Sequence, residues 1–342
     1  MRRINWGIIG LGNIANKFSK EFDKIGNAKL LAVASKNNYK LKNFGEYFNI
    51  EEKFLFKNYQ DLINCNDLDI IYIALPNSLH KKWILKAIEN KKNVLVEKPA
   101  TINLSEAMEI KECLKDSKVL FTEAFMYRYH PQINSIIKII ENNKIGNLLS
   151  MESSFGINIL SKKKFFFFNQ KKKINSKSRL FDKQLGGGCI LDLGCYPSSF
   201  SLLIGSLKNK LNENNFRLSK IFIERGETGV DIDCSAELEF QDGFKSKINS
   251  SFKRSLGNKS IIYGENGSII VNNTWFGGDV ILRTNGNAEK IINFETDKNI
   301  YNYQIEEISK ILIDRLSKPN FPIVSLDETL SNMKIIDNWL NF

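Results

Sequence analysis

The stretch INWGIIGLGNIANKFSKEF, residues 4–22, decides the fold of this chain. It begins with a short apolar run that contains β-branched residues, which predicts a buried strand, and it continues with apolar residues at helical spacing. Between the two lies the pattern GxGxxA. In that context the first glycine permits a tight turn, the second lets the backbone approach a pyrophosphate, and the alanine lets the helix pack closely on the strand. The turn therefore predicts a dinucleotide site, and its expected cofactor ligands are Gly10, Gly12, Asn13 and Ile14.

The rest of the chain shows two different rhythms of strands and helices. Up to residue 125, short apolar runs alternate with helical patterns, as in a parallel sheet that helices cover on both faces. From residue 216 to about 295, strand-like runs recur without helices between them, which predicts an antiparallel sheet. Two helical patterns, at about 301–317 and 326–340, close the chain. We therefore expect an α/β protein, and its 342 residues suffice for two domains.

The end of the second predicted strand bears on the choice of cofactor. In dinucleotide-binding folds an acidic side chain at this place holds the 2′-hydroxyl of NAD. This chain has Ser35 and Lys36 there and no acid. A hydroxyl and an ammonium suit the 2′-phosphate of NADP, so NADP is the expected cofactor and NAD the alternative. The opposing interpretation is a solvent-exposed strand end that contacts no cofactor.

The net charge of +11 is concentrated in one part of the chain. Segment 161–183 holds nine lysines and arginines against one aspartate, a local net charge of 9 − 1 = +8. We interpret this segment as a solvated loop or, alternatively, as a contact for an anionic substrate, with Arg179 as a substrate ligand. No recognisable nucleic-acid-binding module accompanies the charge, so nucleic acid is not an expected partner.

Cysteine and histidine usage narrows the class of protein further. The five cysteines are scattered and none forms a CxxC pair, so we expect a reducing cytoplasm and no disulfide framework. Only two histidines are present, which argues against a multi-histidine metal site, and no bound metal is expected. No apolar run approaches the roughly 18 residues that span a bilayer, so no membrane contact is expected either.

Two further stretches carry candidate chemistry. The stretch GGGCILDLGCYP, residues 186–197, places Asp192 and Tyr196 four residues apart, so that an acid and a phenol share one face of a helix. The stretch LVEKPATINLSEA places Lys98 just after a predicted parallel strand, at the edge where open α/β sheets bind their ligands. The stretch LPNSLHKKW, residues 75–83, follows the preceding strand in the same way.

Together with TEAFMYRYHPQ, residues 122–132, these stretches resemble the glucose–fructose oxidoreductase, inositol dehydrogenase and rhizopine catabolism (Gfo/Idh/MocA) family over nearly the whole chain. The resemblance implies an N-terminal Rossmann domain, residues 1–123, and a C-terminal α+β domain, residues 124–325, with a large, mostly antiparallel open sheet. It implies that the last helix, within residues 326–342, packs back on the Rossmann domain. Because the sheet of this family often forms an oligomer face, a homodimer or homotetramer is expected.

The resemblance also implies catalytic roles. The family usually pairs an acid with a histidine four residues later, and Tyr196 stands where that histidine would be, as in the branch of glucose–fructose oxidoreductase, dimeric dihydrodiol dehydrogenase and D-xylose dehydrogenases. Tyr196 is then the general acid/base, because nearby positive charge lowers the pKa of a phenol from its usual value of about 10. Lys98 orients the reacting hydroxyl or carries the proton itself, and Asp192 binds neighbouring substrate hydroxyls. The alternative is a half-buried tyrosine capped by an aspartate.

The remaining expected contacts lie just past the ends of predicted strands. Tyr127 and Arg128 are expected to line the nicotinamide and the substrate, and His80 has the alternative of capping a helix. The further cofactor ligands that we expect are Pro76, Asn77, His80, Glu97 and Lys98.

The expected function is hydride transfer between NAD(P) and a secondary alcohol or hemiacetal carbon of a sugar or cyclic polyol. One alternative is a dehydrogenase of a nucleotide-linked or phosphorylated sugar, with segment 161–183 meeting the phosphates. An alternative of another class is a catalytically inactive regulator that senses NADP. The joint presence of Lys98, Asp192 and Tyr196 argues against the regulator.

Overall fold

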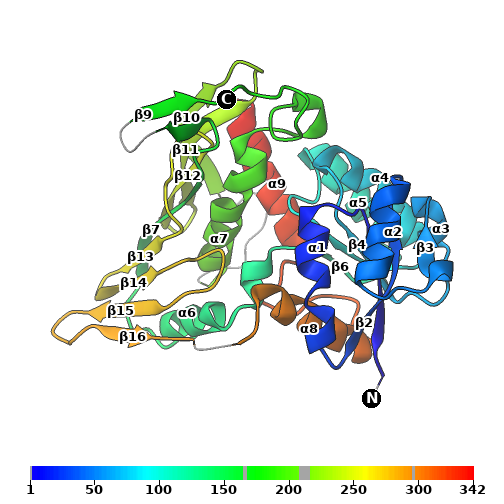
Figure 1. Cartoon of the computed structure of the whole chain (residues 1–342). Helices are drawn as coiled ribbons and strands as arrows, with labels where there is room; N and C mark the ends of the chain where they lie inside the picture. Colours follow the sequence, from blue (N-terminus) through cyan, green and yellow to red (C-terminus); the bar gives the residue numbers. More distant parts are fainter. Residues whose placement is uncertain (1, 165–167, 208–215, 295–296) are drawn as a thin grey trace. The chain divides into compact units, whose positions relative to one another are not determined.

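A computed structural model provides the fold of the protein (Figure 1). It describes residues 2–164, 168–207, 216–294 and 297–342, and for 162–164 and 168–171 it describes the backbone alone. The chain divides into two compact units. Unit 1 comprises Met1–Thr101, Ser105–Tyr129 and Thr296–Thr329, and unit 2 comprises Ile102–Leu104, His130–Glu295 and Leu330–Phe342.

Unit 1 is built on a six-stranded parallel sheet in the order β3-β2-β1-β4-β5-β6. Its strands are β1 (Ile4–Ile9), β2 (Ala28–Ala34), β3 (Leu55–Phe56), β4 (Ile70–Ile73), β5 (Asn93–Val96) and β6 (Phe121–Glu123). Most strand residues are buried, as expected for a parallel sheet with both faces covered. The order reverses between β1 and β4, and this reversal is where such sheets bind ligands. The predicted Rossmann architecture is confirmed.

Six helices of unit 1 surround this sheet within the described residues. They are α1 (Asn13–Ser19), α2 (Asn38–Tyr47), α3 (Tyr59–Ile63), α4 (His80–Glu89), α5 (Leu104–Leu114) and α8 (Ile300–Ile313). The last of them comes from far along the chain: Trp6 Nε1 on β1 donates to Ser309 Oγ on α8 at 3.0 Å, and Ile305 and Ile308 are fully buried in the same core cluster.

The grouping of the C-terminal residues differs from the domain boundaries that we expected. Thr296–Thr329 belongs to unit 1, whereas we had placed residues up to 325 in the second domain. The last helix, α9 (Leu326–Leu340), is divided, because from Leu330 onward it is grouped with unit 2. A helical pattern shows that one face is buried but not which sheet buries it, which explains the difference. Packing of the whole last helix on the Rossmann domain stays a prediction.

Unit 2 contains an eight-stranded sheet in the order β10-β11-β12-β7-β13-β14-β15-β16. Every neighbouring pair is antiparallel except β12 with β7, so the predicted mostly antiparallel sheet is confirmed. Figure 1 shows α6 (Pro131–Glu141) and α7 (Cys195–Ser206) along one face of it. The strands are β7 (Leu148–Gly156), β10 (Phe216–Arg225), β11 (Asp231–Phe240), β12 (Lys245–Ser251), β13 (Ser260–Gly264), β14 (Gly267–Val271), β15 (Val280–Thr284) and β16 (Lys290–Ile292).

Part of the basic segment 161–183 forms two paired strands, whereas we expected a loop. β8 (Ser161–Lys164) and β9 (Phe168–Lys171) pair in an antiparallel, two-stranded sheet. Residues 165–167 lie outside the described part of the chain. An irregular stretch with a short 3₁₀ helix, Lys183–Leu185, then leads to the glycines at 186–188.

One helical stretch in the described chain, Lys183–Ser206, is long and apolar enough to cross a membrane by length and composition. From the sequence we expected no apolar run of this length. The structure joins consecutive helical turns into one stretch, and the stretch passes the test as a whole. Of its most apolar window, 94% is buried inside the protein. A buried core helix passes the same test, so the stretch is weak evidence for a membrane span.

Candidate active site

The GxGxxA turn joins β1 to α1 at the carboxyl edge of the parallel sheet. Gly10 has φ +93°, and a Cβ there would stand 2.5 Å from the carbonyl oxygen of Ala74, so both its conformation and its surroundings require glycine. Gly12 is different, because no atom lies within 4 Å of the place of its Cβ. That open space lets a ligand approach the backbone, as a bound pyrophosphate would require. The turn therefore fits the dinucleotide that its sequence predicts.

The end of β2 presents the two residues that bear on cofactor choice. Ser35 is buried, and its hydroxyl accepts a hydrogen bond from the Asn37 N–H at 3.1 Å. Lys36 is exposed, and its Nζ lies 5.8 Å from the centre of the Tyr59 ring. Burial raises the pKa of Tyr59, so the ring is a neutral platform beside the ammonium. An exposed ammonium at this edge is available to a phosphate group.

The loops after β4 and β5 are tied to each other by His80, the first residue of α4. His80 is fully buried, and its ring nitrogens lie 2.9 Å from the carbonyl oxygen of Pro99 and 2.8 Å from that of Leu75. Because both contacts are to main-chain carbonyls of unit 1, this placement favours a role in holding the two loops over the predicted role as a cofactor ligand. The other predicted ligands of these loops are Pro76, Asn77, Glu97 and Lys98, and all lie at the same edge of the sheet.

Glu97 and Lys98 directly follow β5. The Tyr72 hydroxyl on β4 donates to the Glu97 carboxylate, and the Glu97 N–H donates to the Ile73 carbonyl at 3.0 Å, so Glu97 continues the ladder of the sheet. Lys98 is the next residue, and it is half-buried. The sheet thus fixes the backbone that leads to Lys98 and directs it to the carboxyl edge.

Arg128 occupies a different environment from the one expected for a substrate ligand. It is 1% exposed, and its guanidinium donates to the Tyr127 hydroxyl at 2.8 Å, to the Pro322 carbonyl at 3.0 Å and to the Glu328 carboxylate. These contacts join the turn after β6 to the chain that precedes α9 and to the first turn of α9. The burial of Arg128 favours a structural role for it in unit 1. Contact with the nicotinamide or the substrate stays a prediction for Tyr127 and Arg128.

Glu123, the last residue of β6, is a site residue that we did not predict. It is 1% exposed, and burial raises the pKa of its carboxyl to about 7. Its two oxygens accept hydrogen bonds from the Ala100 N–H at 2.8 Å and the Thr329 hydroxyl at 2.7 Å. The available signal was a charged residue inside an apolar predicted strand, which a strand covered on both faces does not otherwise accommodate.

In unit 2, the stretch with Asp192 begins as one π-helical turn, Ile190–Gly194, and continues as α7 from Cys195. The regular helix that we expected is therefore widened at Asp192, and such turns are frequent at functional sites. Arg179 from the basic segment pairs with Asp192, with 3.1 Å between Nη1 and Oδ1. Two predicted substrate ligands therefore contact each other.

Tyr196 lies in the first turn of α7 and is 5% exposed, more buried than the half-buried tyrosine of the alternative interpretation. Its ring makes an edge contact with Phe155 at 5.2 Å between centroids and a tilted contact with Trp275 at 5.5 Å. Two aromatic side chains from the sheet side of unit 2 therefore set the orientation of the phenol ring.

The glycines before this helix make room for a buried acid. Gly188 has φ +116°, and a Cβ there would stand 2.1 Å from Asp231 Oδ1. The other oxygen, Oδ2, accepts a hydrogen bond from the Ile190 N–H at 2.6 Å at the start of the π-helical turn. Glycine is therefore needed at position 188, because the Asp231 carboxylate on β11 occupies the space of a side chain. The same carboxylate holds the start of the helix that carries Asp192.

Asp231 also belongs to a buried group with Cys189 and Cys234, whose ligand-type atoms all lie within 4.8 Å of one another. Sequence spacing did not reveal this group. The Cys189 Sγ lies 3.7 Å from Cys234 Sγ and 3.5 Å from the Ser250 carbonyl, contacts that S–H groups make as weak donors. Burial raises the pKa of Cys189, which favours neutral, packed thiols. The expectation of no bound metal stays a prediction.

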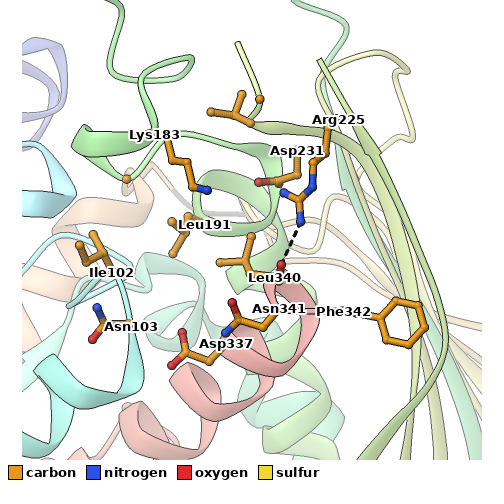
Figure 2. Close-up of a pocket in the computed structure, with 14 residues that line it drawn as sticks. Ile102, Asn103, Lys183, Leu191, Arg225, Asp231, Asp337, Leu340, Asn341 and Phe342 are labelled. Carbon is orange, nitrogen blue, oxygen red and sulfur yellow. Dashed lines mark hydrogen bonds between the residues drawn. The ribbon is translucent and has the colours of Figure 1, made fainter. Parts of the chain in front are cut away.

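A cavity of about 460 Å³ lies within unit 2, and Gly186 and Gly187 form part of its lining. Figure 2 shows Lys183, Arg225 and Asp231 around it, with Arg225 Nη2 bonded to the Leu340 carbonyl at 3.0 Å. None of the predicted site residues lines it. The lining residues are Ile102, Asn103, Lys183, Gly186, Gly187, Leu191, Arg225, Gly229, Val230, Asp231, Asp337, Leu340, Asn341 and Phe342.

The predicted residues thus form two sets. The candidate cofactor ligands and Lys98 gather at the carboxyl edge of the sheet in unit 1, and Arg179, Asp192 and Tyr196 gather at the start of α7 in unit 2. The meeting of the two sets at one reaction centre stays a prediction.

Comparison with known proteins identifies the family. A model described as "Oxidoreductase family, NAD-binding Rossmann fold" matches residues 4–125, and the "GFO/IDH/MocA C-terminal domain" model matches residues 133–270. The chain belongs to the Gfo/Idh/MocA family. This confirms the family and the fold that the sequence motifs predict, and it places the protein among oxidoreductases.

Several members of the Gfo/Idh/MocA family are similar to this chain at low sequence identity. The trans-1,2-dihydrobenzene-1,2-diol dehydrogenase of Xenopus tropicalis is 26% identical over 98% of this chain and 96% of its own length. A D-xylose 1-dehydrogenase (NADP(+)) of Haloferax volcanii is 26% identical over 72% of this chain and 69% of its own. Among solved structures, the aldose-aldose oxidoreductase of Caulobacter crescentus has a TM-score of 0.83 and 20% identity, over 99% of this chain and 97% of that one.

Proposed function

We propose that this protein is an NADP-preferring dehydrogenase or reductase that acts on a secondary alcohol or hemiacetal carbon of a sugar or cyclic polyol. The observation that supports this most is the edge of the Rossmann sheet, where the open turn at Gly12 and the exposed Lys36 surround the place of a dinucleotide and Lys98 stands after β5. Two relatives at 26% identity are named dehydrogenases of a diol and of xylose, and one of these names NADP.

The proposed mechanism divides the work among three side chains. Bound NADP would supply or accept the hydride. The Tyr196 hydroxyl exchanges the proton of the reacting alcohol, held in place by its aromatic neighbours. The Lys98 ammonium orients the oxygen of that alcohol and stabilises negative charge that develops on it. Asp192 accepts hydrogen bonds from neighbouring substrate hydroxyls. Its carboxylate would then bind these hydroxyls and the Arg179 guanidinium at the same time.

A second candidate is a dehydrogenase of a phosphorylated or nucleotide-linked sugar. One specific contact favours it: Arg179, from the basic segment, already reaches Asp192 at 3.1 Å. An anionic substrate held at Asp192 would therefore have a guanidinium within reach, and arginine binds phosphate groups well. We also propose that the protein is cytoplasmic and assembles as a homodimer or homotetramer through the sheet of unit 2.

A panel of aldoses, inositols and nucleotide sugars, followed by NADPH absorbance, tests these possibilities together. Turnover of neutral sugars or inositols supports the first candidate, and a strong preference for the anionic sugars supports the second. NADPH binding without hydride transfer to any member of the panel would instead support the catalytically inactive NADP-sensing regulator.

A further inference from the structure

Lys98 stands in a turn whose backbone is anchored on both sides. Before it, the Glu97 N–H donates to the Ile73 carbonyl at 3.0 Å, which is the last bond of the strand ladder. After it, Pro99 has no N–H to donate, and the next donor is the N–H of Ala100. That N–H donates to the Glu123 carboxylate at 2.8 Å. The conformation of the turn therefore depends on a side chain and not on the sheet alone.

Burying the carboxyl group of Glu123 at this place destabilises the fold. Glu123 is 1% exposed, at the end of β6, and a buried carboxyl costs free energy unless its oxygens are hydrogen-bonded. The charged groups that face it are Arg128 from the turn after β6 and Glu328 from α9, and these two already pair with each other. Glu123 therefore has no cation of its own in the described part of unit 1, so an ion pair does not explain its presence.

We propose that Glu123 is a positioning residue that holds the turn of Lys98. Its Oε2 fixes Ala100, two residues after Lys98, and its Oε1 accepts from the Thr329 hydroxyl at 2.7 Å, which fixes the carboxyl group itself. All of these residues belong to unit 1. The inference rests on the proposed catalytic role of Lys98, because a misplaced ammonium would no longer face the reacting oxygen.

Glutamine at position 123 should do the same work. Its carbonyl oxygen can accept from the Ala100 N–H while its amide donates to the Thr329 hydroxyl. Leucine has a similar volume but accepts nothing, so the buried Ala100 N–H would lose its partner. Glu123→Gln and Glu123→Leu therefore separate the hydrogen bond from the packing.

The experiment compares Glu123→Leu, Glu123→Gln and Thr329→Val in the full chain, with turnover of the best substrate and amide hydrogen exchange of the peptide that spans residues 97–103. We expect Glu123→Leu to lower kcat by about ten- to a hundredfold, the effect of a catalytic group displaced by a fraction of an ångström to an ångström, and to speed exchange in that peptide. Glu123→Gln should keep kcat and exchange close to native. Thr329→Val removes the bond that fixes the carboxyl group but leaves the Ala100 contact, so it should lower kcat less than Glu123→Leu does.

Native kcat and native exchange in folded Glu123→Leu would overturn the inference. An equal loss of kcat in Thr329→Val would overturn it as well, because the bond to the Ala100 N–H would then not account for the loss. If Glu123→Leu does not fold, Glu123→Asp, which keeps the carboxyl group but is shorter by one methylene, takes its place with the same expected losses. Lys98→Met separates the role of Glu123 from the proposed function of the protein. A fully active Lys98→Met would refute the proposed function itself, whereas an inactive Lys98→Met beside an active Glu123→Leu would refute only the role of Glu123.

Discussion

At the scale of single residues, the hydroxyl of Tyr196 is the most direct test of the chemistry. Tyr196→Phe keeps the ring contacts with Phe155 and Trp275 and deletes only the hydroxyl. We expect kcat to fall by roughly 10²–10⁴-fold, the usual contribution of a positioned acid or base, with NADP(H) affinity nearly unchanged. Steady-state kinetics and cofactor titration measure both, and Tyr39→Phe on the exposed face of α2 is the control. Native turnover of Tyr196→Phe would leave Lys98 or a water as the proton carrier.

Lys36 tests the choice of cofactor. Its exposed ammonium at the end of β2 is the charge expected to meet a 2′-phosphate. Lys36→Ala should weaken NADP(H) binding by about tenfold or more, the worth of one hydrogen bond to a charged group, and should leave NAD(H) binding unchanged. Fluorescence titration with both cofactors measures this, with Lys42→Ala on α2 as a control for net charge. Equal affinity of the native protein for NADP(H) and NAD(H) would contradict the proposed preference.

Glu123 makes the stability of unit 1 depend on pH. Burial raises the pKa of its carboxyl from 4.5 to about 7 and outweighs the hydrogen bonds from Thr329 and Ala100. Because the folded state binds this proton more tightly, the contribution to stability is fully present below pH 4.5 and is lost as the pH rises through about 7.

Glu123→Gln cannot ionise and should lack this dependence. Between about pH 5.5 and about pH 8.5, the free energy of unfolding of the native protein should fall by about 2 kcal/mol more than that of Glu123→Gln. Urea unfolding of both proteins at the two pH values measures the difference. Parallel behaviour of the two proteins would show that Glu123 does not titrate in this range.

At the scale of elements, the turn between β1 and α1 contains two glycines with different structural roles, Gly10 and Gly12. Gly10→Ala should destabilise the fold, because φ is +93° and the new Cβ would stand 2.5 Å from the Ala74 carbonyl oxygen. Gly12→Ala meets no atom within 4 Å, so it should fold normally but bind NADP(H) more weakly, since the methyl group fills the cofactor's approach. Thermal unfolding and cofactor titration separate the two outcomes. Unchanged NADP(H) affinity of Gly12→Ala would argue against a dinucleotide at this turn.

The same elements show what the sequence could and could not predict. Strand ends and their motifs were predictable, because the pattern GxGxxA and the residues after β5 have a local physical meaning. The partner of Gly188 was not, since Asp231 lies 231 − 188 = 43 residues away and only the fold brings its carboxylate into the space of the missing side chain. For a related reason the sequence did not show that α8 belongs to unit 1: its buried isoleucines fit any apolar sheet face equally well.

At the scale of the whole molecule, the sheet of unit 2 is the proposed surface of assembly. Phe222 on β10 and Tyr263 on β13 are apolar side chains of this sheet that are exposed by 51% and 37%. We expect light scattering to show a homo-oligomer at micromolar concentration. The double variant Phe222→Asp, Tyr263→Asp should shift it toward the monomer, while Tyr39→Asp in unit 1 should not. A monomeric native protein would refute assembly through this sheet.

The hydrogen bond from Trp6 to Ser309 spans 303 residues. The ribosome delivers a chain at about 5–20 residues per second, so roughly 15–60 s separate the emergence of its two ends. Throughout that interval β1 has been made but the helix that covers its indole has not, and by its end most of unit 2, residues 130–295, has been made as well. β1 is thus made long before the helix that completes its packing. During this time the nascent chain can cover Trp6 with its early neighbours Phe18 and Phe22 but not with α8, so chaperones that hold apolar segments have time to act there.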